Sequence, residues 1–551
     1  MARRSLGRCW ASVAFALFGA ALHASDLVVP ELKPTVLQED LVDRYFERFN
    51  ADDEELYQNA FPNKIAVGTI GRQIPLFECP DDDIERTYYF RWWTYRKHLR
   101  RTGDGGWVVT EFLPEVGWAG PENTIACPFG HHVREGRWLR DAQYLDGYVG
   151  FMLEKGRVNG PGSYANGPAW SALERAKVTG DFGFLQRHLR GFVKNFEMWT
   201  NGWTVGSLSL KSVKNVQGAQ PVPLKGGFHP ERGLFDFAGD REGSEFALSA
   251  DGARPFVNAM MWGEATAIAE IARSAGELEL SGRFDRIASI LDNGIKTRLW
   301  NEKKRFFTTL SPEGTLDDVR ELHGYAPFYF GMDLKGFEEA WNPLMSETGF
   351  WAPKGLTFPA RDTPGFDLTS DLRRHECLWN GPSWPYATSI ALTALYETLQ
   401  RGIALPLGAE EFAALVHQYA AQQVRRLPDG RVVPWIDENL DPMTGDWIAR
   451  RQLAEWDLRG IRKMAYRERG KDYNHSTFCD LVIAGLCGVV PRKDGKVVVR
   501  PLAPKSWDWW CVDGVRYHGH DVTVLYDRDG SRYGRGKGLV VLVDGRPISC
   551  L

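Results

Sequence analysis

The sequence predicts a mainly α-helical protein whose helical hairpins close into a toroid, followed by a small C-terminal β domain. From about residue 37 to about residue 490, helix-period apolar stretches are joined by loops rich in Gly, Pro, Asn and Asp. After about residue 490 the apolar residues recur with period two, as in β-strands. The loops between the predicted helices are long and carry Trp, Arg, His and acids, which favours a toroid with one functional face over an open solenoid.

The predicted helices occur in pairs separated by short Asp- or Gly-containing turns, which supply helix caps. Such pairs form antiparallel hairpins because a short connection returns the chain along the first helix. The clearest segments are 169–178 with 182–199, 255–274 with 278–299, and 383–399 with 409–423, and the segment 477–486 ends the series.

Four segments near the C-terminus alternate in the manner of β-strands and are separated by Asp-Gly turns. These segments are 496–501, 509–515, 521–526 and 538–546. We expect three parts in the chain: a signal peptide over residues 1–24, a helical domain over 25–490 that includes an N-terminal helix, and a β domain over 491–551 packed on the helices. The signal peptide is indicated by Arg3 and Arg4, the apolar run 11–21 and the small residues that follow, and it predicts a secreted or periplasmic protein.

The composition excludes some partners. The 551 residues carry a formal net charge of −4, with 67 basic and 71 acidic side chains, which gives no reason to expect a nucleic acid or an anionic membrane surface. No segment after the signal peptide is expected to span a membrane. A neutral substrate fits this charge better. The 21 Trp residues suit the flat apolar faces of sugar rings as well as a core, and composition alone does not separate a carbohydrate partner from core packing. The oligomeric state stays open.

Cysteine and histidine give no sign of a cofactor. Of eight Cys residues, seven remain after the signal peptide, and their wide spacing does not form a disulfide framework. Two short His-containing strings, Cys127 to His132 and His518 to His520, lack a second set of ligands at the expected spacing. We therefore expect neither a metal nor another cofactor.

The first candidate catalytic segment is an acidic loop before the helix at residue 255. Asp236, Asp240, Glu242 and Glu245 lie within ten residues of one another in a loop that contains several Gly residues. Partial burial of such crowded carboxyls raises the pKa of one of them, which a general acid requires. A solvated loop that caps a helix has the same composition, so this segment alone leaves both interpretations open.

The second candidate segment holds Glu438, which follows an apolar run and precedes an Asp-Pro-Met-Thr-Gly turn. A carboxylate in this rigid setting can activate a water molecule on the face of a sugar opposite Asp240, as in an inverting glycosidase. We expect the two carboxyl groups to lie about 6.5 to 9.5 Å apart across one pocket.

Three strings that mix aromatic rings with hydrogen-bonding groups complete the candidate site, because sugar sites need both stacking and polar contacts. The residues expected to bind substrate are Arg91, Trp92, Trp93, Trp379, Asn380, Trp384, Tyr473 and His475.

The strings at 379–385, 435–445 and 474–482 resemble the six-hairpin glycosidases, and most closely the mannosylglycerate-hydrolase-like proteins related to glycoside hydrolase family 63 and the family 37 trehalases. The resemblance covers roughly residues 85 to 490 and implies an (α/α)6 toroid with Asp240 as general acid and Glu438 as general base. The Asn-Ser-Pro that family 63 members tend to show after the acid is missing here, so Asp236 and Glu245 remain alternative acids.

These observations predict a secreted, exo-acting and inverting glycoside hydrolase of oligosaccharides or polysaccharides. One alternative is a polysaccharide lyase on the same toroid, which would use Tyr473, Asn474 and His475 but would not need the acids at 240 and 438. The other alternative is a carbohydrate-binding protein without catalysis. The sugar and its linkage are set by loop geometry that a sequence does not reveal.

Overall fold

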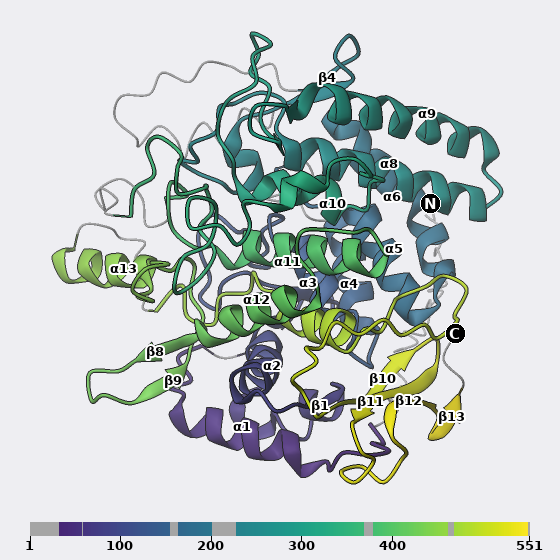
Figure 1. Ribbon diagram of the computed structural model, residues 1–551, viewed down its shortest axis with the longest axis vertical. Coiled ribbons are helices and arrows are strands. Elements are labelled where there is room, and N and C mark those ends of the chain that lie inside the picture. Colours follow the sequence, from purple (N-terminus) through teal and green to yellow (C-terminus); the bar gives the residue numbers. More distant parts are fainter. Residues whose placement is uncertain are drawn as a thin grey trace, which may run out of the picture.

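The computed structural model describes residues 32–57, 59–154, 163–200, 227–368, 378–460 and 468–548. Helices are the main regular secondary structure, and an antiparallel sheet, yellow in Figure 1, lies at one side of them. The expected signal peptide at 1–24 falls outside the described residues. A mainly helical domain with a C-terminal sheet is therefore present, as the sequence predicts.

The predicted helical hairpins are confirmed. The helices are α1 (Asp40–Asp52), α2 (Asp82–Tyr95), α3 (Phe129–Gly136), α4 (Gln143–Glu154), α5 (Pro168–Thr179), α6 (Phe182–Thr200), α8 (Pro255–Ser274), α9 (Leu278–Gly294), α10 (Ala326–Tyr329), α11 (Pro385–Gln400), α12 (Ala409–Ala421), α13 (Ile448–Arg459) and α14 (Phe478–Asp480). Shorter helical turns are η1 (Asn63–Ile65), η2 (Ile70–Arg72), η3 (Arg96–His98), η4 (Gly239–Glu242), η5 (Ile295–Leu299), η6 (Leu322–Tyr325), η7 (Glu338–Trp341) and η8 (Leu481–Leu486).

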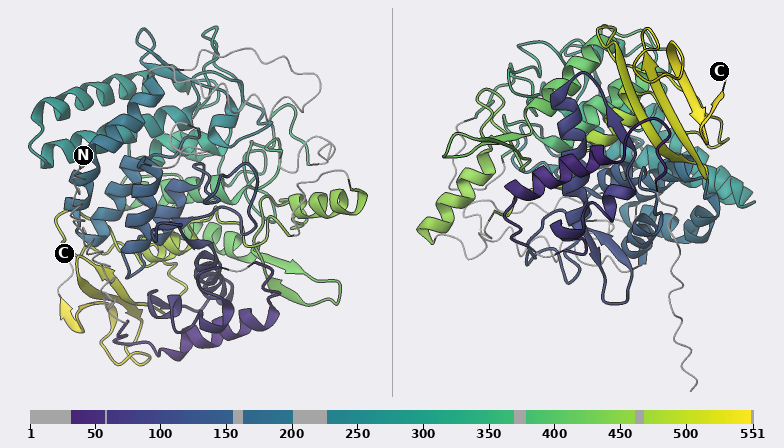
Figure 2. Two further views of the ribbon diagram at one scale, coloured as in Figure 1. Left: turned by 180° about the vertical axis from the view of Figure 1, so that it is seen from behind. Right: turned by 90° about the horizontal axis from the view of Figure 1, so that it is seen from below.

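Burial separates inner from outer helices. Helices α8 and α11 are buried on nearly every side and begin with Pro255 and Pro385, whose missing N–H costs nothing in the first helical turn. Helix α9, the hairpin partner of α8, buries few side chains, among them Phe284 and Leu291, and exposes the rest. A helix that is apolar all round belongs in an interior, whereas a one-sided helix covers it. The hairpin α8–α9 thus has one inner and one outer member, which Figure 2 shows from behind.

The buried helices contact one another in a closed circuit. Helix α2 packs on α12, α12 on α11, α11 on α10 and α10 on α8; the circuit returns through α5, α3 and α14 to α2. The buried ion pairs of Asp480 join two members of this circuit. Its Oδ2 lies 2.8 Å from Nε of Arg134 and its Oδ1 lies 2.7 Å from Nη2 of Arg137, while the Trp138 indole N–H donates to Oδ1 at 2.8 Å.

The C-terminal sheet has the strand order β1-β10-β11-β12-β13, with every pair antiparallel. Four of its strands lie after residue 490, but β1 comes from the N-terminal part of the chain. The strands are β1 (Leu76–Glu78), β10 (Trp509–Tyr517), β11 (His520–Asp527), β12 (Gly538–Val543) and β13 (Arg546–Ile548). The two-stranded ladders elsewhere are β2 (Leu99–Arg101) with β3 (Trp107–Val109), β4 (Gly227–His229) with β5 (Leu234–Asp236), β6 (Trp300–Asn301) with β7 (Phe306–Phe307), and β8 (Val424–Arg426) with β9 (Val432–Pro434).

One sequence prediction for the sheet is wrong. The segment 496–501 is no strand and makes only an isolated bridge between Val489 and Val499. The strand predicted at 509–515 is present as β10, which runs through Asp513 and Gly514 with a bulge. At this bulge, Asp513 Oδ2 accepts hydrogen bonds from the backbone N–H groups of Thr35, Val36 and Leu37 at 2.9, 2.6 and 2.9 Å. The start of the described chain is thereby attached to the sheet.

Across the described part of the chain, no helix is both long enough and apolar enough to cross a membrane.

Candidate active site

The acidic loop that contains Asp240 leaves β5, forms the turn η4 and leads into α8. Glu242 anchors this loop: its Oε1 accepts the N–H of Val257 at 3.0 Å, and its Oε2 lies 2.8 Å from Nε of Arg254. Burial acts to raise the pKa of Glu242, but the Arg254 charge outweighs it and the pKa falls to about 2. Glu242 is thus a fixed anion that holds the loop to α8.

Asp236 belongs to the β4–β5 hairpin. Its Oδ2 lies 3.2 Å from Nη1 of Arg232 and 3.4 Å from Nε2 of His229. Burial raises its pKa, and the charges of His229 and Arg232 oppose the shift. Asp236 is thus paired with two residues of its own hairpin. Of the two alternatives to Asp240 as the proton donor, we therefore favour Glu245.

Glu438 lies in a loop held on both sides. The residue two positions after it, Leu440, exchanges backbone hydrogen bonds with Ser383 at 2.9 and 3.0 Å, which joins the Glu438 loop to the Trp-rich loop at 379–384. Asp441 Oδ1 accepts the N–H groups of Met443 and Thr444, which closes the predicted turn. Glu438 as a whole residue is 6% exposed. Its Oε2 lies 3.1 Å from Nη2 of Arg469.

The two loops meet at Glu245. Burial raises the pKa of Glu245 to about 8, and the charges of Asp240 and Glu438 both act in the same direction. The Trp-rich loop joins the two acidic loops: the Trp379 backbone N–H donates to the carbonyl of Glu245 at 3.2 Å, and Ser383 exchanges hydrogen bonds with Leu440 beside Glu438. The Trp379 indole N–H donates to Glu245 Oε2 at 3.3 Å and opposes the shift. We call Asp240, Glu245 and Glu438 the acid cluster.

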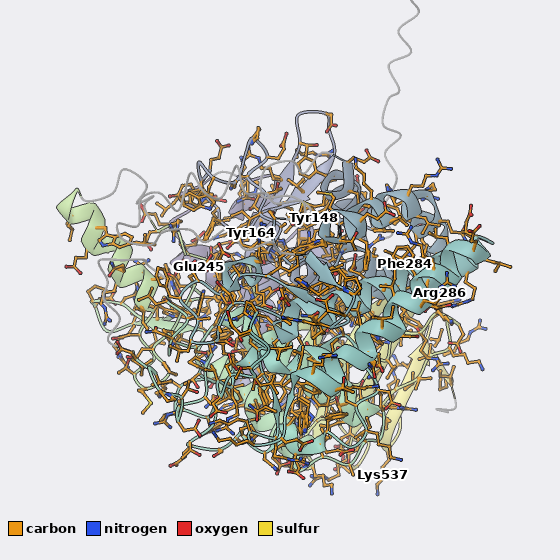
Figure 3. The ribbon with its side chains drawn as sticks, turned by 90° about the horizontal axis from the view of Figure 1, so that it is seen from above. Tyr148, Tyr164, Glu245, Phe284, Arg286 and Lys537 are labelled. Atoms are coloured by element: carbon orange, nitrogen blue, oxygen red, sulfur yellow. The ribbon has the colours of Figure 1, made fainter. Side chains whose placement is uncertain are left out.

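Tyr164 lies beside the acid cluster. Burial raises its pKa well above the ordinary value, and the charges of Glu245 and Asp240 add to the shift. The labelled side chains of Tyr164 and Glu245 lie near each other in Figure 3. The Ala165 N–H donates to the carbonyl of Arg241 at 2.8 Å, so the Tyr164 segment is tied to the acidic loop.

Asp240 differs from Glu245 in its access to solvent. Its side chain is exposed, whereas that of Glu245 is half-buried. Surrounding protein nevertheless desolvates Asp240 and raises its pKa, against the opposing charge of Arg241. Asp240 is therefore the member of the acid cluster that a ligand from solvent can reach first.

Stacked aromatic rings from the string at 378–386 lie beside the acid cluster. Trp379 and Trp384 stack with ring centroids 4.2 Å apart, and Trp384 stacks on Tyr386 at 4.9 Å. His475 contacts this stack, with 6.2 Å between its ring centroid and that of Trp384, and it lies 4.0 Å from the ring of Tyr473. Burial lowers the pKa of His475, so its ring is neutral. Asn380 is half-buried in the same loop, and its carbonyl accepts the N–H of Asp367.

The string at 91–93 does not join the stack as a unit. Trp93 donates from Nε1 to Asn50 Oδ1 of α1 at 2.8 Å, and Trp92 is fully buried with its ring against Tyr88 and Tyr95. These contacts lie within α2 and between α2 and α1, so the convergence of both rings on the acids stays a prediction. Arg91, which is also buried, donates to Asn474 Oδ1 at 3.4 Å and so underlies the loop of His475.

Two site residues were not found from the sequence. Glu111 follows β3 and is buried, with Oε1 3.0 Å from Nε2 of His475. Arg469 contacts Glu438 and sits above the rings of Phe112 and Trp118. The neighbours of both residues are distant in sequence. The only local signal for Glu111 is an acid that closely follows the apolar strand β3.

The histidines of the Cys127 to His132 string are buried and contact backbone carbonyl groups of neighbouring segments. His131 Nε2 lies 3.1 Å from the carbonyl oxygen of Tyr386, and His132 Nε2 lies 2.8 Å from that of Asn474. Within the described ranges, no group of three or more His, Cys, Asp and Glu side chains is arranged to hold a metal ion.

A helical domain whose loops gather carboxyl groups beside stacked Trp rings has the chemical features of a glycosidase, in which acids act on a sugar held by ring contacts. Comparison with known proteins agrees. The family model described as the mannosylglycerate hydrolase MGH1-like glycoside hydrolase domain matches residues 121–476, and the C-terminal domain of glycosyl hydrolase family 65 matches residues 491–550. The chain belongs to the MGH1-like glycoside hydrolases, which confirms the resemblance seen in the sequence.

Solved structures place the chain beside larger proteins. A protein titled "Sialidase" is 32% identical with a TM-score of 0.80 over 93% of this chain, and this chain spans 44% of its length. The family 78 rhamnosidase of Bacillus sp. GL1 shares the fold, with a TM-score of 0.53 and 13% identity over 83% of this chain and 40% of that chain.

Proposed function

We propose that the protein is a secreted, exo-acting glycoside hydrolase that cleaves oligosaccharides or polysaccharides with inversion of the anomeric configuration. The observation that carries the proposal is that the loop of Trp379 and Ser383 joins both acidic loops: Trp379 donates to the carbonyl and the carboxylate of Glu245, and Ser383 exchanges backbone hydrogen bonds with Leu440 beside Glu438. Placing carboxyl groups from two separate loops near one another does not stabilise the fold, because like charges repel, so a catalytic role explains the arrangement better. Glycosidases need such a pair, one group protonated and the other ionised.

The roles follow from access and charge. Burial raises the pKa of both carboxyls, and the charge of Asp240 adds to the shift of Glu245, whose pKa reaches about 8; we infer that Asp240 and Glu245 share a proton near neutral pH. Asp240 is the exposed member and delivers the proton to the leaving oxygen. Glu438, which Arg469 pairs with, removes a proton from the attacking water. Inversion requires room for that water, so the predicted separation of about 6.5 to 9.5 Å between the Asp240 and Glu438 carboxyls belongs to the proposal.

The architecture proposed for this function is an (α/α)6 toroid over residues 25–490 with a β domain over 491–551. The closed circuit of contacts between buried helices supports the toroid. The family match that begins at residue 491 supports the division of the chain. Export rests on the signal-peptide pattern of residues 1–24.

Buried rings support the acid cluster from within the protein. Trp379 is joined to the acids directly, through its hydrogen bond to Glu245, and it stacks with Trp384 and Tyr386 in a rigid apolar layer. Trp379 and Trp384 are 1% exposed and Tyr386 is 2% exposed, so this layer positions the acids. Asn380, which is half-buried in the same loop, can hydrogen-bond to a sugar hydroxyl group.

Proton NMR of the fresh product tests the proposal directly. A panel of aryl glycosides and plant or microbial oligosaccharides identifies a cleaved substrate, and the anomeric proton of the first product then reports its configuration. We expect the inverted anomer. A retained anomer, or a product with the ultraviolet absorbance of an unsaturated uronate, would contradict the inverting hydrolysis proposed here.

A further inference from the structure

Glu111 contributes a buried carboxyl to the site from a part of the chain that precedes the matched family domain. It follows β3 and is 6% exposed. Its carbonyl accepts the N–H of Asn474 at 3.4 Å, and its Oε1 lies 3.0 Å from Nε2 of His475. The segment that begins at Glu111 is therefore attached to the loop 469–475, which also carries Arg469.

Arg469 connects this segment to Glu438. Its Nη2 lies 3.1 Å from Glu438 Oε2. Its guanidinium lies 5.1 Å from the ring centroid of Phe112 and 5.4 Å from that of Trp118. These distances suit cation–π contacts, which orient a guanidinium as well as attract it. The charge of Arg469 also reaches Glu111 and acts to lower the pKa of that carboxyl.

We propose that Glu111, together with the rings of Phe112 and Trp118, positions Arg469 and thereby Glu438 for hydrolysis. This inference rests on the proposed function, in which Glu438 activates water. Glu111 holds the loop that carries Arg469 through His475 and Asn474, and the two rings hold the guanidinium itself. The guanidinium then presents one fixed edge to the Glu438 carboxylate, which leaves the other carboxylate oxygen for the water. Glu111 acts through Arg469 and is a positioning residue.

The protonation state of Glu111 matters to this arrangement. Burial raises its pKa to about 8, while Arg469 and a hydrogen bond from Tyr473 oppose the shift. At neutral pH Glu111 is therefore uncharged. Of the two carboxyl groups, Glu438 alone is then available as an anion to pair with Arg469. Ionisation of Glu111 above about pH 8 adds a second anion and draws Arg469 away from Glu438.

Five titratable groups near Glu111 have pKa values that burial shifts away from this range. Burial raises the pKa values of the tyrosines and the thiol that the Glu111 charge reaches, and it lowers that of His475. The groups that face Glu111 are Arg469, Tyr473, His475, Cys127, Tyr148, Tyr164 and Tyr386.

The Glu111→Gln variant tests the inference, because it keeps the shape of the side chain and removes its ionisation. In the wild type, Glu111 and Glu245 both ionise near pH 8, and log(kcat/KM) on the cleaved substrate should fall with a slope of about −2 above that pH. The slope should become about −1 in Glu111→Gln, with kcat at neutral pH within about 3-fold of wild type. An alkaline limb identical to that of the wild type would overturn the inference.

Truncation gives a second, independent readout. Glu111→Ala should lower kcat at neutral pH by about 10- to 100-fold with little change in KM, as the loss of a supporting group does, and Glu111→Gln should restore it. Wild-type kcat in Glu111→Ala would overturn the inference. Glu115→Gln is the matched control, because Glu115 belongs to the same segment, is largely exposed and pairs only with Arg100 among the contacts shown; it should leave both slope and kcat unchanged.

The two proposals fail in different ways. If Glu438 is not the base, Glu438→Gln retains wild-type kcat, whatever Glu111 does. If only the positioning role is wrong, Glu438→Gln is inactive while Glu111→Gln has the pH profile of the wild type. Near-ultraviolet circular dichroism of Glu111→Ala separates loss of fold from loss of position, and an unfolded variant leaves the decision to Glu111→Gln.

Discussion

Gly243 lies directly against the thiol of Cys127: a Cβ at position 243 would be 2.6 Å from Cys127 Sγ. Its φ angle is +68°, in the left-handed region that favours glycine. The turn at Gly243 separates Asp240 from Glu245 along the chain, so this close approach helps to fix where the two carboxyls meet.

Gly243→Ala should therefore lower the free energy of unfolding by about 2 to 4 kcal/mol, from backbone strain together with the steric overlap at Cys127. Urea unfolding measures the change. Gly402→Ala is the control for strain alone, because Gly402 has a φ of +76° with no atom within 4 Å of an added Cβ, and it should cost about 1 kcal/mol. Adding Cys127→Ala to Gly243→Ala should recover part of the loss; strictly additive effects would mean that the overlap has no energetic weight.

Removing the proposed acid should affect substrates unequally. Asp240→Asn should lower kcat by about 10²- to 10⁴-fold for natural glycosides, whose leaving groups need protonation, and less for activated aryl glycosides. Steady-state kinetics on both substrate types measure the difference. Equal losses on both would remove Asp240 from the role of proton donor.

Glu245→Gln tests the proton shared by the pair. The acid acts when protonated, so the wild type should lose activity as the pH rises through about 8, the value to which burial and the charges of Asp240 and Glu438 raise the Glu245 pKa. Without the Glu245 charge, the pKa of Asp240 falls, and the alkaline limb should move to lower pH. A limb that stays in place would show that Asp240 and Glu245 do not titrate together.

Glu438→Gln should slow natural and activated substrates alike, by about 10²- to 10⁴-fold, because water attack is required whatever the leaving group. Glu242→Gln is the matched variant in the acidic loop. Glu242 is buried in ion pairs with Arg254, so its loss should lower stability by about 3 to 5 kcal/mol. Thermal unfolding and kinetics on the same preparation distinguish a loss of catalysis in Glu438→Gln from a loss of stability in Glu242→Gln. If Glu438→Gln is stable and retains full turnover, Glu438 is excluded as the base.

Asp480→Asn should destabilise the fold by about 3 to 5 kcal/mol, since it breaks buried pairs with Arg134 and Arg137. Burial acts to raise the Asp480 pKa, but the two arginines outweigh it and hold it below the ordinary value. The stabilisation is therefore complete above pH of about 4, the ordinary Asp pKa, and is lost as the pH falls below it.

Urea unfolding at neutral and acidic pH checks this prediction. The wild type should lose stability on acidification faster than Asp480→Asn does. Asp285→Asn, which removes an exposed pair with Arg273, is the control and should change stability by less than about 1 kcal/mol. Parallel pH curves for the wild type and Asp480→Asn would mean that this carboxylate does not titrate differently in the folded state.

The helices were predictable because their apolar period is local. Helices α5, α6, α8 and α9 begin and end within a few residues of the predicted bounds, with Pro at the starts of α5 and α8. The segment 496–501 also alternates, but it finds no partner strand, and a β pattern without a partner does not form a ladder. Period alone cannot supply that partner.

The site divides in the same way. Asp240, Glu245 and Glu438 could be nominated because each lies in a loop whose Gly and acid content is unusual. Glu111 could not, because what distinguishes it is burial beside His475 and Arg469, more than 350 residues away along the chain. Trp92 and Trp93 resembled the other Trp residues in composition, yet the direction of a side chain on a helix buried all round depends on neighbours that the local sequence does not specify.

The strand β1 has a consequence for how the chain is made. Leu76–Glu78 pairs with β10, and Asp513 of β10 binds the N–H groups of residues 35–37. During synthesis these early residues leave the ribosome long before their partners exist, so a row of strand hydrogen-bonding groups must wait for almost the whole helical domain to be translated. The last strands thus complete the first part of the molecule, and a shortened C-terminus would leave an uncovered strand edge open to association with other chains.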